Sequence, residues 1–132
     1  MTVNYIVDPE LNAPDVADLF RRSTIRRPID DLPRIGKMIA ASDLTVAAFD
    51  GDKLVGYARS LTDFIWCCYL SDLAVDVEYQ HKGIGKELIR ITQEQLSEES
   101  MLLLLSAPEA MEYYPKVGFQ KSENAWIKPR RK

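Results

Sequence analysis

The spacing of apolar residues predicts strands and helices that follow one another along the whole chain. Short apolar or alternating segments predict strands, and apolar residues three or four positions apart predict helices. The expected strands are Val3–Val7, Leu44–Phe49, Lys53–Leu61, Phe64–Val77 and Met101–Leu105, with a final hairpin over Gly118-Phe119 and Ala125-Trp126-Ile127. The expected helices follow Asn12-Ala13-Pro14, open at Pro28 and Asp30-Asp31, and cover Gly83–Leu96 and Glu109–Tyr114, the last ended by Pro115.

This order of elements predicts a mixed α/β fold. The strand, helix and strand over 64–77, 84–96 and 101–105 form a unit whose two strands run parallel, joined by a right-handed crossover. The turn at Asp50-Gly51-Asp52 makes the earlier pair an antiparallel hairpin. The continuous apolar run Met101–Leu105 predicts a strand that is buried on both faces. We therefore expect a mostly antiparallel sheet flanked by helices, with residues 1–132 as a single domain.

Composition and charge narrow the class of protein. The 132 residues carry a net charge of −3, which argues against non-specific binding to nucleic acid, and the basic ending KPRRK is short enough to be a solvated tail. No apolar run approaches the ~20 residues of a membrane span, and the first residues do not resemble a secretory signal, so a cytoplasmic protein without membrane contact is expected. Cys67 and Cys68 are adjacent and His81 is the one histidine, so a structural metal is not expected.

The segment Gln80-His81-Lys82-Gly83-Ile84-Gly85-Lys86 joins a predicted strand to a predicted helix. The first amides of a helix lack partners within the helix, and glycines let a ligand approach the backbone. With two lysines nearby, such a loop suits a phosphate group, although a tight turn with exposed lysines would have the same sequence. The spacing fits neither a P-loop nor a dinucleotide fingerprint, since Glu87 follows Lys86 and position 88 is leucine.

Two motifs instead resemble the Gcn5-related N-acetyltransferases, the GNAT family. The first is LSDLAVDVEYQHKGIGKELI at 70–89, with a strand ending in L-A-V, a short polar bend and [QR]-x-x-G-x-[GA] at a helix start. The second is EAMEYYPKVGF at 109–119, with an aromatic-tyrosine pair before K-x-G-F. Both stand in the order and at the spacing of the family, and the order of elements matches as well. The resemblance therefore covers nearly the whole chain and implies the acyl-CoA N-acyltransferase fold.

The resemblance implies acetyl-CoA as the acetyl donor, with no metal. Loop amides would bind the pyrophosphate of the coenzyme, and the end of the preceding strand would pair with its pantetheine arm, which carries amides of its own. The arm would lie where strands 70–77 and 101–105 diverge. The implied coenzyme-binding residues are Leu73, Ala74, Val75, Gln80, His81, Lys82, Gly83, Ile84, Gly85 and Lys86.

Tyr114 is the candidate general acid that the second motif implies. A phenol with a pKa of ~10 stays protonated at neutral pH and can protonate the departing thiolate. A packed aromatic side chain at a helix end is the alternative. Pro115 stands where relatives often carry a polar helical residue, and it should disfavour helical geometry at Tyr114.

The general base is not specified by either motif. Asp72 is the main candidate because it interrupts an apolar strand, and burial would raise its pKa. A structural, hydrogen-bonded Asp72 is the alternative reading. Asp63, Asp76 and Glu78 are further candidates, and a chain of water molecules would make a protein base unnecessary.

The acceptor is expected to be a primary amine of a small molecule. The family builds the acceptor site from the first two helices, their loop and the later strands, and little of this chain lies outside the common core. Asp30, Asp31 and Asp43 would attract a cation, whereas Arg26 and Arg27 would attract a carboxylate. A non-catalytic acetyl-CoA sensor and a scaffold without a ligand are competing functions. A homodimer through the last strands also stays open.

Overall fold

The computed structural model describes residues 2–132 and contains one five-stranded sheet with helices on both faces. The strands are β1 (Val3–Val7), β2 (Leu44–Asp50), β3 (Lys53–Thr62), β4 (Cys67–Val75) and β5 (Met101–Leu103). The helices are α1 (Ala13–Arg22), α2 (Leu32–Ala40), α3 (Ile84–Glu94) and α4 (Tyr113–Lys116), with short 3-10 turns η1 (Val77–Tyr79) and η2 (Pro108–Ala110). The predicted mixed α/β architecture is confirmed.

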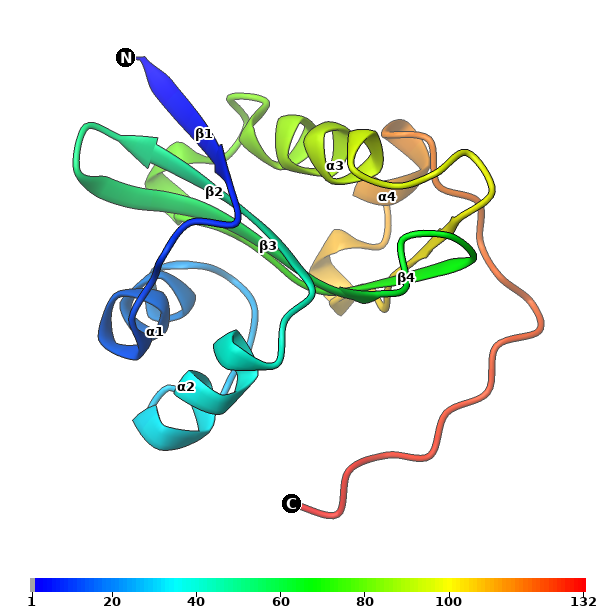
Figure 1. Cartoon of the computed structure of the whole chain (residues 1–132), viewed down its shortest axis with the longest axis horizontal. Coiled ribbons are helices and arrows are strands. Elements are labelled where there is room, and N and C mark those ends of the chain that lie inside the picture. The colour runs from blue at the N-terminus through cyan, green and yellow to red at the C-terminus, as the bar shows by residue number, and fades with distance from the viewer. Residues whose placement is uncertain (1) are drawn as a thin grey trace.

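The strands lie side by side in chain order. The pairs from β1 to β4 are antiparallel, and β4 and β5 are parallel, with α3 in the crossover between them. Helices α1 and α2 lie on one face of the sheet and α3 on the other, as Figure 1 shows. The sequence therefore predicts the layers correctly, because each of them follows from local apolar spacing and from one β-α-β unit.

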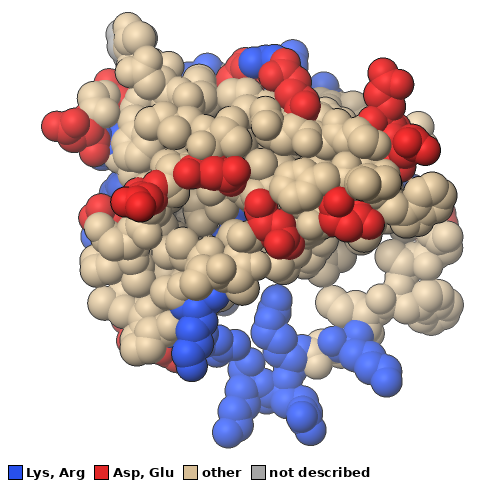
Figure 2. Space-filling view, viewed as in Figure 1, with Lys and Arg blue, Asp and Glu red and all other residues tan. Residues whose placement is uncertain are grey.

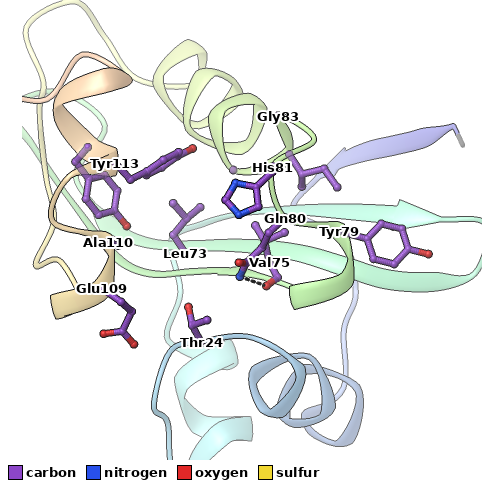
Figure 3. A pocket seen from close by; sticks show the side chains of 13 residues that line it. Thr24, Leu73, Val75, Tyr79, Gln80, His81, Gly83, Glu109, Ala110 and Tyr113 are labelled. Carbon is purple, nitrogen blue, oxygen red and sulfur yellow. Dashed lines mark hydrogen bonds between the residues drawn. The ribbon is translucent and has the colours of Figure 1, made fainter.

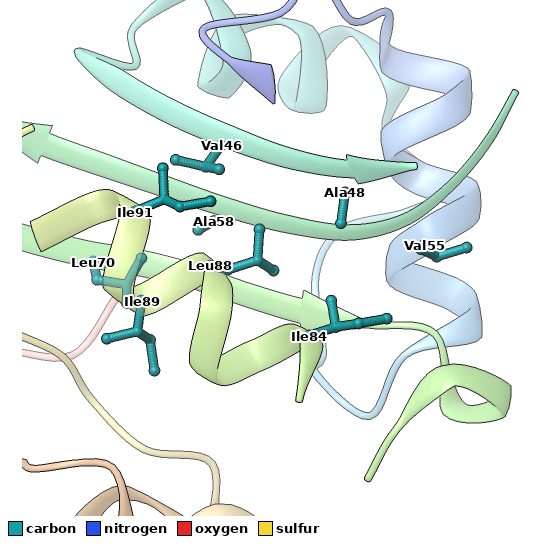
Figure 4. Packing of buried hydrophobic residues seen from close by; sticks show 9 residues of the cluster. All are labelled: Val46, Ala48, Val55, Ala58, Leu70, Ile84, Leu88, Ile89 and Ile91. Carbon is teal, nitrogen blue, oxygen red and sulfur yellow. The ribbon is translucent and has the colours of Figure 1, made fainter. Parts of the chain in front are cut away.

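Two apolar cores hold these layers together. On one face, Val16, Phe20 and Ile35 from α1 and α2 pack on Tyr57 and Ala74 of the sheet. On the other face, α3 turns its apolar side onto β2, β3 and β4 (Figure 4), and the packed residues there are Val46, Ala48, Val55, Ala58, Leu70, Ile84, Leu88, Ile89 and Ile91. This packing fixes the start of α3 against the end of β4.

Three of the sequence predictions are wrong near the C-terminus. Strand β5 has three residues, and Met101 is 55% exposed, so the run 101–105 is not buried on both faces. The expected final hairpin is absent from the described residues, because 120–132 form no strand and lie exposed. In Figure 1 this tail runs away from the body, and its basic side chains project together in Figure 2.

The third error concerns Pro115, which lies inside α4 and does not end a helix before it. Because α4 begins at Tyr113, the proline falls in the first turn, where a missing N–H costs no hydrogen bond. Tyr114 is consequently helical, contrary to the expectation. The long strand predicted from Phe64 also begins later, at Cys67, because the Asp63 carboxylate accepts hydrogen bonds from the backbone N–H groups of residues 65–67 and holds them in a turn.

Candidate functional site

A gap in the sheet begins where β4 and β5 stop pairing. Their paired residues run from Cys67 with Met101 to Tyr69 with Leu103, whereas β4 continues to Val75. Opposite β3, strand β4 carries one extra residue, Ser71, because Arg59 pairs with Asp72 and Ser60 with Leu70. Such a bulge bends a strand. On the side toward β5, the last residues of β4 therefore have no strand partner. Their backbone N–H and C=O groups on that side can pair with a ligand that carries amides.

The end of β4 leads into a loop that exposes the first amides of α3. Gly83 caps α3 in the left-handed region, with φ of 83°, and a Cβ there would have no heavy atom within 4 Å. His81 also has a positive φ, 63°, which is uncommon for a residue with a side chain. The unpaired N–H groups and the positive end of the helix dipole both favour an anion at this point.

The two glycines of the loop serve different purposes. Gly83 supplies the left-handed turn, whereas Gly85 leaves room inside the cleft, since a Cβ on it would lie 2.9 Å from the Tyr113 hydroxyl oxygen. Gln80 donates from its side-chain amide to the Val75 carbonyl, at 3.3 Å, and so ties the loop to the end of β4 (Figure 3). The loop and the open strand edge therefore form one surface.

The loop, the strand edge and α4 enclose a cleft of about 390 Å³. Figure 3 shows Gly83 and His81 at one end, Leu73 near the middle, and Thr24 with Glu109 at the other end. The lining residues are Thr24, Leu73, Val75, Tyr79, Gln80, His81, Gly83, Ile84, Gly85, Glu109, Ala110, Tyr113 and Tyr114. The cleft is long, and its two ends are chemically different.

Most of the predicted coenzyme-binding residues lie in this cleft. Seven of them line it: Leu73, Val75, Gln80, His81, Gly83, Ile84 and Gly85. Ala74 does not, because its side chain is buried under α1, so only its backbone could take part. Lys82 and Lys86 are exposed outside the lining, and the Lys82 ammonium lies 5.6 Å from the centre of the Tyr79 ring.

Tyr114 lines the cleft and is held by the end of α4. Gly118, with φ of 95°, ends this helix, and the Phe119 N–H donates to the Tyr114 carbonyl at 3.1 Å. The chain then turns back, so that the Phe119 ring packs edge-on against Tyr114 with centroids 5.5 Å apart. The glycine and phenylalanine of the K-x-G-F motif thus position the tyrosine.

The environment of Tyr114 keeps its hydroxyl protonated. Burial raises the pKa of Tyr114, the neighbouring Tyr113 adds to that rise, and the charge of Arg27 opposes it. A phenol with a raised pKa is fully protonated at neutral pH, as a general acid must be before it acts. The described geometry therefore suits the predicted acid.

Asp72 lies outside the cleft in a buried ion-pair cluster. Its carboxylate, 1% exposed as a residue, accepts hydrogen bonds from the guanidinium groups of Arg27 and Arg59. These arginines also donate to Ser71, the bulge residue, at its carbonyl and its hydroxyl. Both carboxylate oxygens are engaged by guanidinium groups away from the cleft, so the geometry favours the structural reading of Asp72 over the general base.

The other carboxylates considered as bases also have structural partners. Asp76 pairs with Arg22 and with Lys53, and caps the Glu78 N–H. Asp63 holds the turn before β4, and the backbone N–H groups that donate to it lower its pKa. Glu78 is exposed beyond the cleft lining. None of these groups lies in the described cleft.

Sequence reasoning missed five lining residues: Thr24, Tyr79, Glu109, Ala110 and Tyr113. Thr24 lies in the loop between α1 and α2, and Glu109 in η2, so no local pattern connects them. Tyr113 could have been found, because it belongs to the tyrosine pair of the second motif. Its ring packs edge-on against Tyr114, with centroids 5.3 Å apart.

Three further observations concern features other than the cleft. A second cavity of about 240 Å³ lies on the α1 and α2 face, lined in part by Asp8, Asp43 and Tyr57, and shares no residue with the cleft. Across residues 2–132, no group of three or more His, Cys, Asp or Glu side chains is placed to hold a metal ion. Within the same residues, no helix has the length and apolar character to cross a membrane.

A divergent strand pair beside a helix that opens on a glycine loop has the features that suit an extended ligand with a phosphate group. Comparison with known proteins places this arrangement in a family. Residues 29–128 match the acetyltransferase (GNAT) domain family. The chain therefore belongs to the GNAT family of acetyltransferases, as the two motifs indicated.

Individual relatives are distant. An uncharacterized N-acetyltransferase, ycf52, of Pyropia yezoensis is 34% identical over 71 residues, which are 52% of this chain and 41% of the relative. GCN5-related N-acetyltransferase 2, chloroplastic, of Arabidopsis thaliana is 30% identical over 70 residues, 52% of this chain and 27% of the relative. The chain thus spans less than half the length of either of these curated relatives.

Solved structures share the fold across nearly the whole chain. The GNAT family protein SP0256 from Streptococcus pneumoniae TIGR4 has a TM-score of 0.78 at 20% identity, covering 98% of this chain and 100% of that one. PaiA N-acetyltransferase from Thermoplasma acidophilum, solved in complex with coenzyme A, has a TM-score of 0.71 at 18% identity, covering 95% and 94%. At these identities the likeness shows the fold, and the chemistry must be argued from the residues.

Proposed function

We propose that this protein transfers an acetyl group from acetyl-CoA directly to a primary amine of a small molecule. One observation carries the proposal: the open edge of β4, the amides at the start of α3 and the protonated phenol of Tyr114 all lie in one cleft. Family membership supports the same reaction.

Three features of the cleft support the binding of the coenzyme there. The anionic pyrophosphate suits the positive end of α3, and the absence of a Cβ at Gly85 keeps open a space bordered by the Tyr113 hydroxyl. The amides of the pantetheine arm suit the unpaired backbone of Leu73 and Val75. No metal takes part in this proposal.

The reaction needs no covalent intermediate on the enzyme. The acceptor loses a proton, its neutral nitrogen attacks the thioester carbonyl, and the carbon–sulfur bond breaks as the amide forms. The nitrogen gives up a second proton to solvent as the amide forms. The proton of Tyr114 passes to the thiolate, and the phenolate then takes a proton from solvent. In total, an ammonium ion and acetyl-CoA give an N-acetylated amine, free coenzyme A and one proton.

A small acceptor is favoured over a protein by the dimensions of the cleft. The volume of about 390 Å³ includes the path of the coenzyme, so only the end at Thr24 and Glu109 remains for the acceptor. One solved neighbour, an aminoglycoside acetyltransferase from an uncultured soil sample, acts on a small amine according to its name; it has a TM-score of 0.64 at 19% identity and covers 98% of this chain and 94% of that one.

The experiment that tests the acceptor class is thiol release from acetyl-CoA in the presence of small amines and of lysine-containing peptides. We expect turnover with at least one small amine and little with the peptides. Turnover with peptides alone would overturn the acceptor class. Donor binding without release from any amine would favour the acetyl-CoA sensor instead.

We also propose a cytoplasmic location, although a relative from Arabidopsis thaliana is described as chloroplastic. Fractionation of cells that express the natural protein tests this directly. Recovery from an organelle would contradict the proposal.

A further inference from the structure

We infer that Glu109 forms the acceptor subsite of the cleft and selects amines that arrive as cations. The inference rests on the proposed transfer reaction and names a residue and an acceptor charge that neither motif specifies. Glu109 belongs to η2 and lines the cleft at the same end as Thr24 (Figure 3).

The two ends of the cleft attract ions of opposite charge. Among the lining residues of the described chain, Glu109 has the one carboxylate, and His81 lies with the loop at the far end. The start of α3 attracts anions, whereas Glu109 attracts cations. The polarity of the cleft therefore directs the pyrophosphate to the loop and leaves the acidic end for the other reactant.

The order of the groups along the cleft agrees with this direction. A coenzyme held by the loop at His81 and Gly83 extends past Leu73 along the edge of β4, toward the end where Thr24 and Glu109 lie. Tyr114, the proposed acid, lines the same cleft. The acceptor nitrogen must meet the acetyl group beyond the pantetheine arm, and the side chains available there are a carboxylate and a hydroxyl.

The charge of Arg27 reaches the cleft, since it opposes the rise in the pKa of Tyr114, but the hydrogen-bond partners of Arg27 are not lining residues. Arg27, in the neighbouring loop, is absent from the cleft lining, and its guanidinium donates to Asp72, to the Ser71 carbonyl and to the Arg26 carbonyl. Asp30, Asp31 and Asp43, the acidic residues expected from the sequence to attract a cation, all lie outside the cleft lining. The cation preference is thus assigned to Glu109.

The chemistry of the step limits what Glu109 does. It holds the ammonium form at the mouth of the cleft, and because Glu109 is itself exposed, the proton released before attack can pass to solvent. The neutral nitrogen then attacks as described above. Glu109 is consequently a residue for recognition and positioning, and the reaction does not require it to carry a proton.

The test compares Glu109→Gln with the matched control Glu112→Gln, an exposed glutamate three residues later that does not line the cleft. Calorimetry on protein saturated with coenzyme A would measure binding of 1,6-diaminohexane, which is cationic, and of 1-hexanol, which is not. We expect Glu109→Gln to weaken diamine binding about fivefold or more, with hexanol and coenzyme binding unchanged and Glu112→Gln like the wild type.

Two results would overturn the inference. One is equal diamine affinity in the wild type and in Glu109→Gln, and the other is a wild-type complex that binds the diamine no better than hexanol. If the proposed function is wrong, a different result is expected. The protein would still bind coenzyme A and the diamine but would release no thiol with any amine. Where an amine is turned over, Glu109→Gln should raise KM for cationic acceptors. KM for aniline, which is uncharged at neutral pH, should not change.

Discussion

Tyr114 is the single residue on which the proposed chemistry depends most. Removal of its hydroxyl in Tyr114→Phe leaves the ring free to pack on Phe119, so the fold and the affinity for acetyl-CoA should persist. Turnover should fall about a hundredfold, since general acid catalysis contributes at least that much in typical enzymes. Thiol release and calorimetry on the same samples measure both quantities.

The pH profile separates an acid from a packing residue. Activity should rise with pH while the acceptor amine loses its proton, and should fall again only when Tyr114 itself ionises. Because burial raises the pKa of Tyr114, this descending limb should lie above the ordinary value of ~10. Tyr114→Phe should lack the descending limb. An unchanged profile and unchanged turnover in the variant would rule out the acid role.

Asp72 should behave as a structural residue. In Asp72→Asn the two guanidinium groups of Arg27 and Arg59 lose the anion between them, so the free energy of unfolding should fall by about 3 kcal/mol. Urea unfolding measures this loss, with the exposed Asp30→Asn as the control. A variant that keeps its stability but loses turnover would instead restore Asp72 as the general base.

Tyr57 gives a prediction of stability against pH. It is fully buried, its hydroxyl has no hydrogen-bond partner within residues 2–132, and the nearby Ser42 donates to the Met38 carbonyl. Burial raises the pKa of Tyr57 to about 12. Between pH 10 and 12 the unfolded chain then loses this proton while the folded chain keeps it, so stability falls as pH rises.

Tyr57→Phe should remove that part of the alkaline loss. At neutral pH the variant should be about as stable as the wild type, because no hydrogen bond is lost. Chemical unfolding at pH 8 and pH 11 would show the difference, with the half-buried Tyr69, replaced by phenylalanine, as a comparison on the same sheet. An equal fall in both proteins would mean that Tyr57 ionises normally in the folded state.

At the scale of elements, the loop between β4 and α3 makes the sharpest prediction. Gly83→Asp would force a left-handed turn on a residue with a side chain and would place a negative charge at the anion site. Affinity for acetyl-CoA should fall more than tenfold, measured by calorimetry. Gly51→Asp is the control, because Gly51 also has a positive φ and open space, but lies in the β2–β3 turn. Unchanged affinity in Gly83→Asp would refute the loop assignment.

The elements that sequence predicts well are those set by neighbours in the chain. The N-cap at Asn12, the turn at Gly51 and the glycine loop at Gly83 each depend on a few adjacent residues, and all three stand where the sequence places them. The same holds for K-x-G-F, whose Gly118 ends α4.

Features set by contacts between distant parts of the chain could not be predicted from neighbouring residues. The apolar run from Met101 predicts burial, but whether a face is covered depends on which segments lie over it, and the exposed tail does not cover β5. The partners of Asp72 come from positions 45 residues earlier and 13 residues earlier in the chain. The placement of Thr24 and Glu109 at one end of the cleft likewise depends on the whole fold, so no motif could reveal the proposed acceptor end.

At the scale of the whole molecule, the cleft lies between two parts that pack separately. The core under α3 fixes the proposed anion site, and the core under α1 and α2 carries the loop that bears Thr24. The homodimer stays a prediction. The last strands expected to form it are absent from residues 2–132, and sedimentation would measure the assembly directly.

The first experiment is an acetyl-CoA titration by calorimetry, followed in the same samples by thiol release across a panel of small amines. We expect saturable binding of one coenzyme per chain and amine-dependent release of free thiol, both lost in Gly83→Asp. A protein that binds no acetyl-CoA, although folded, would contradict the assignment of the cleft.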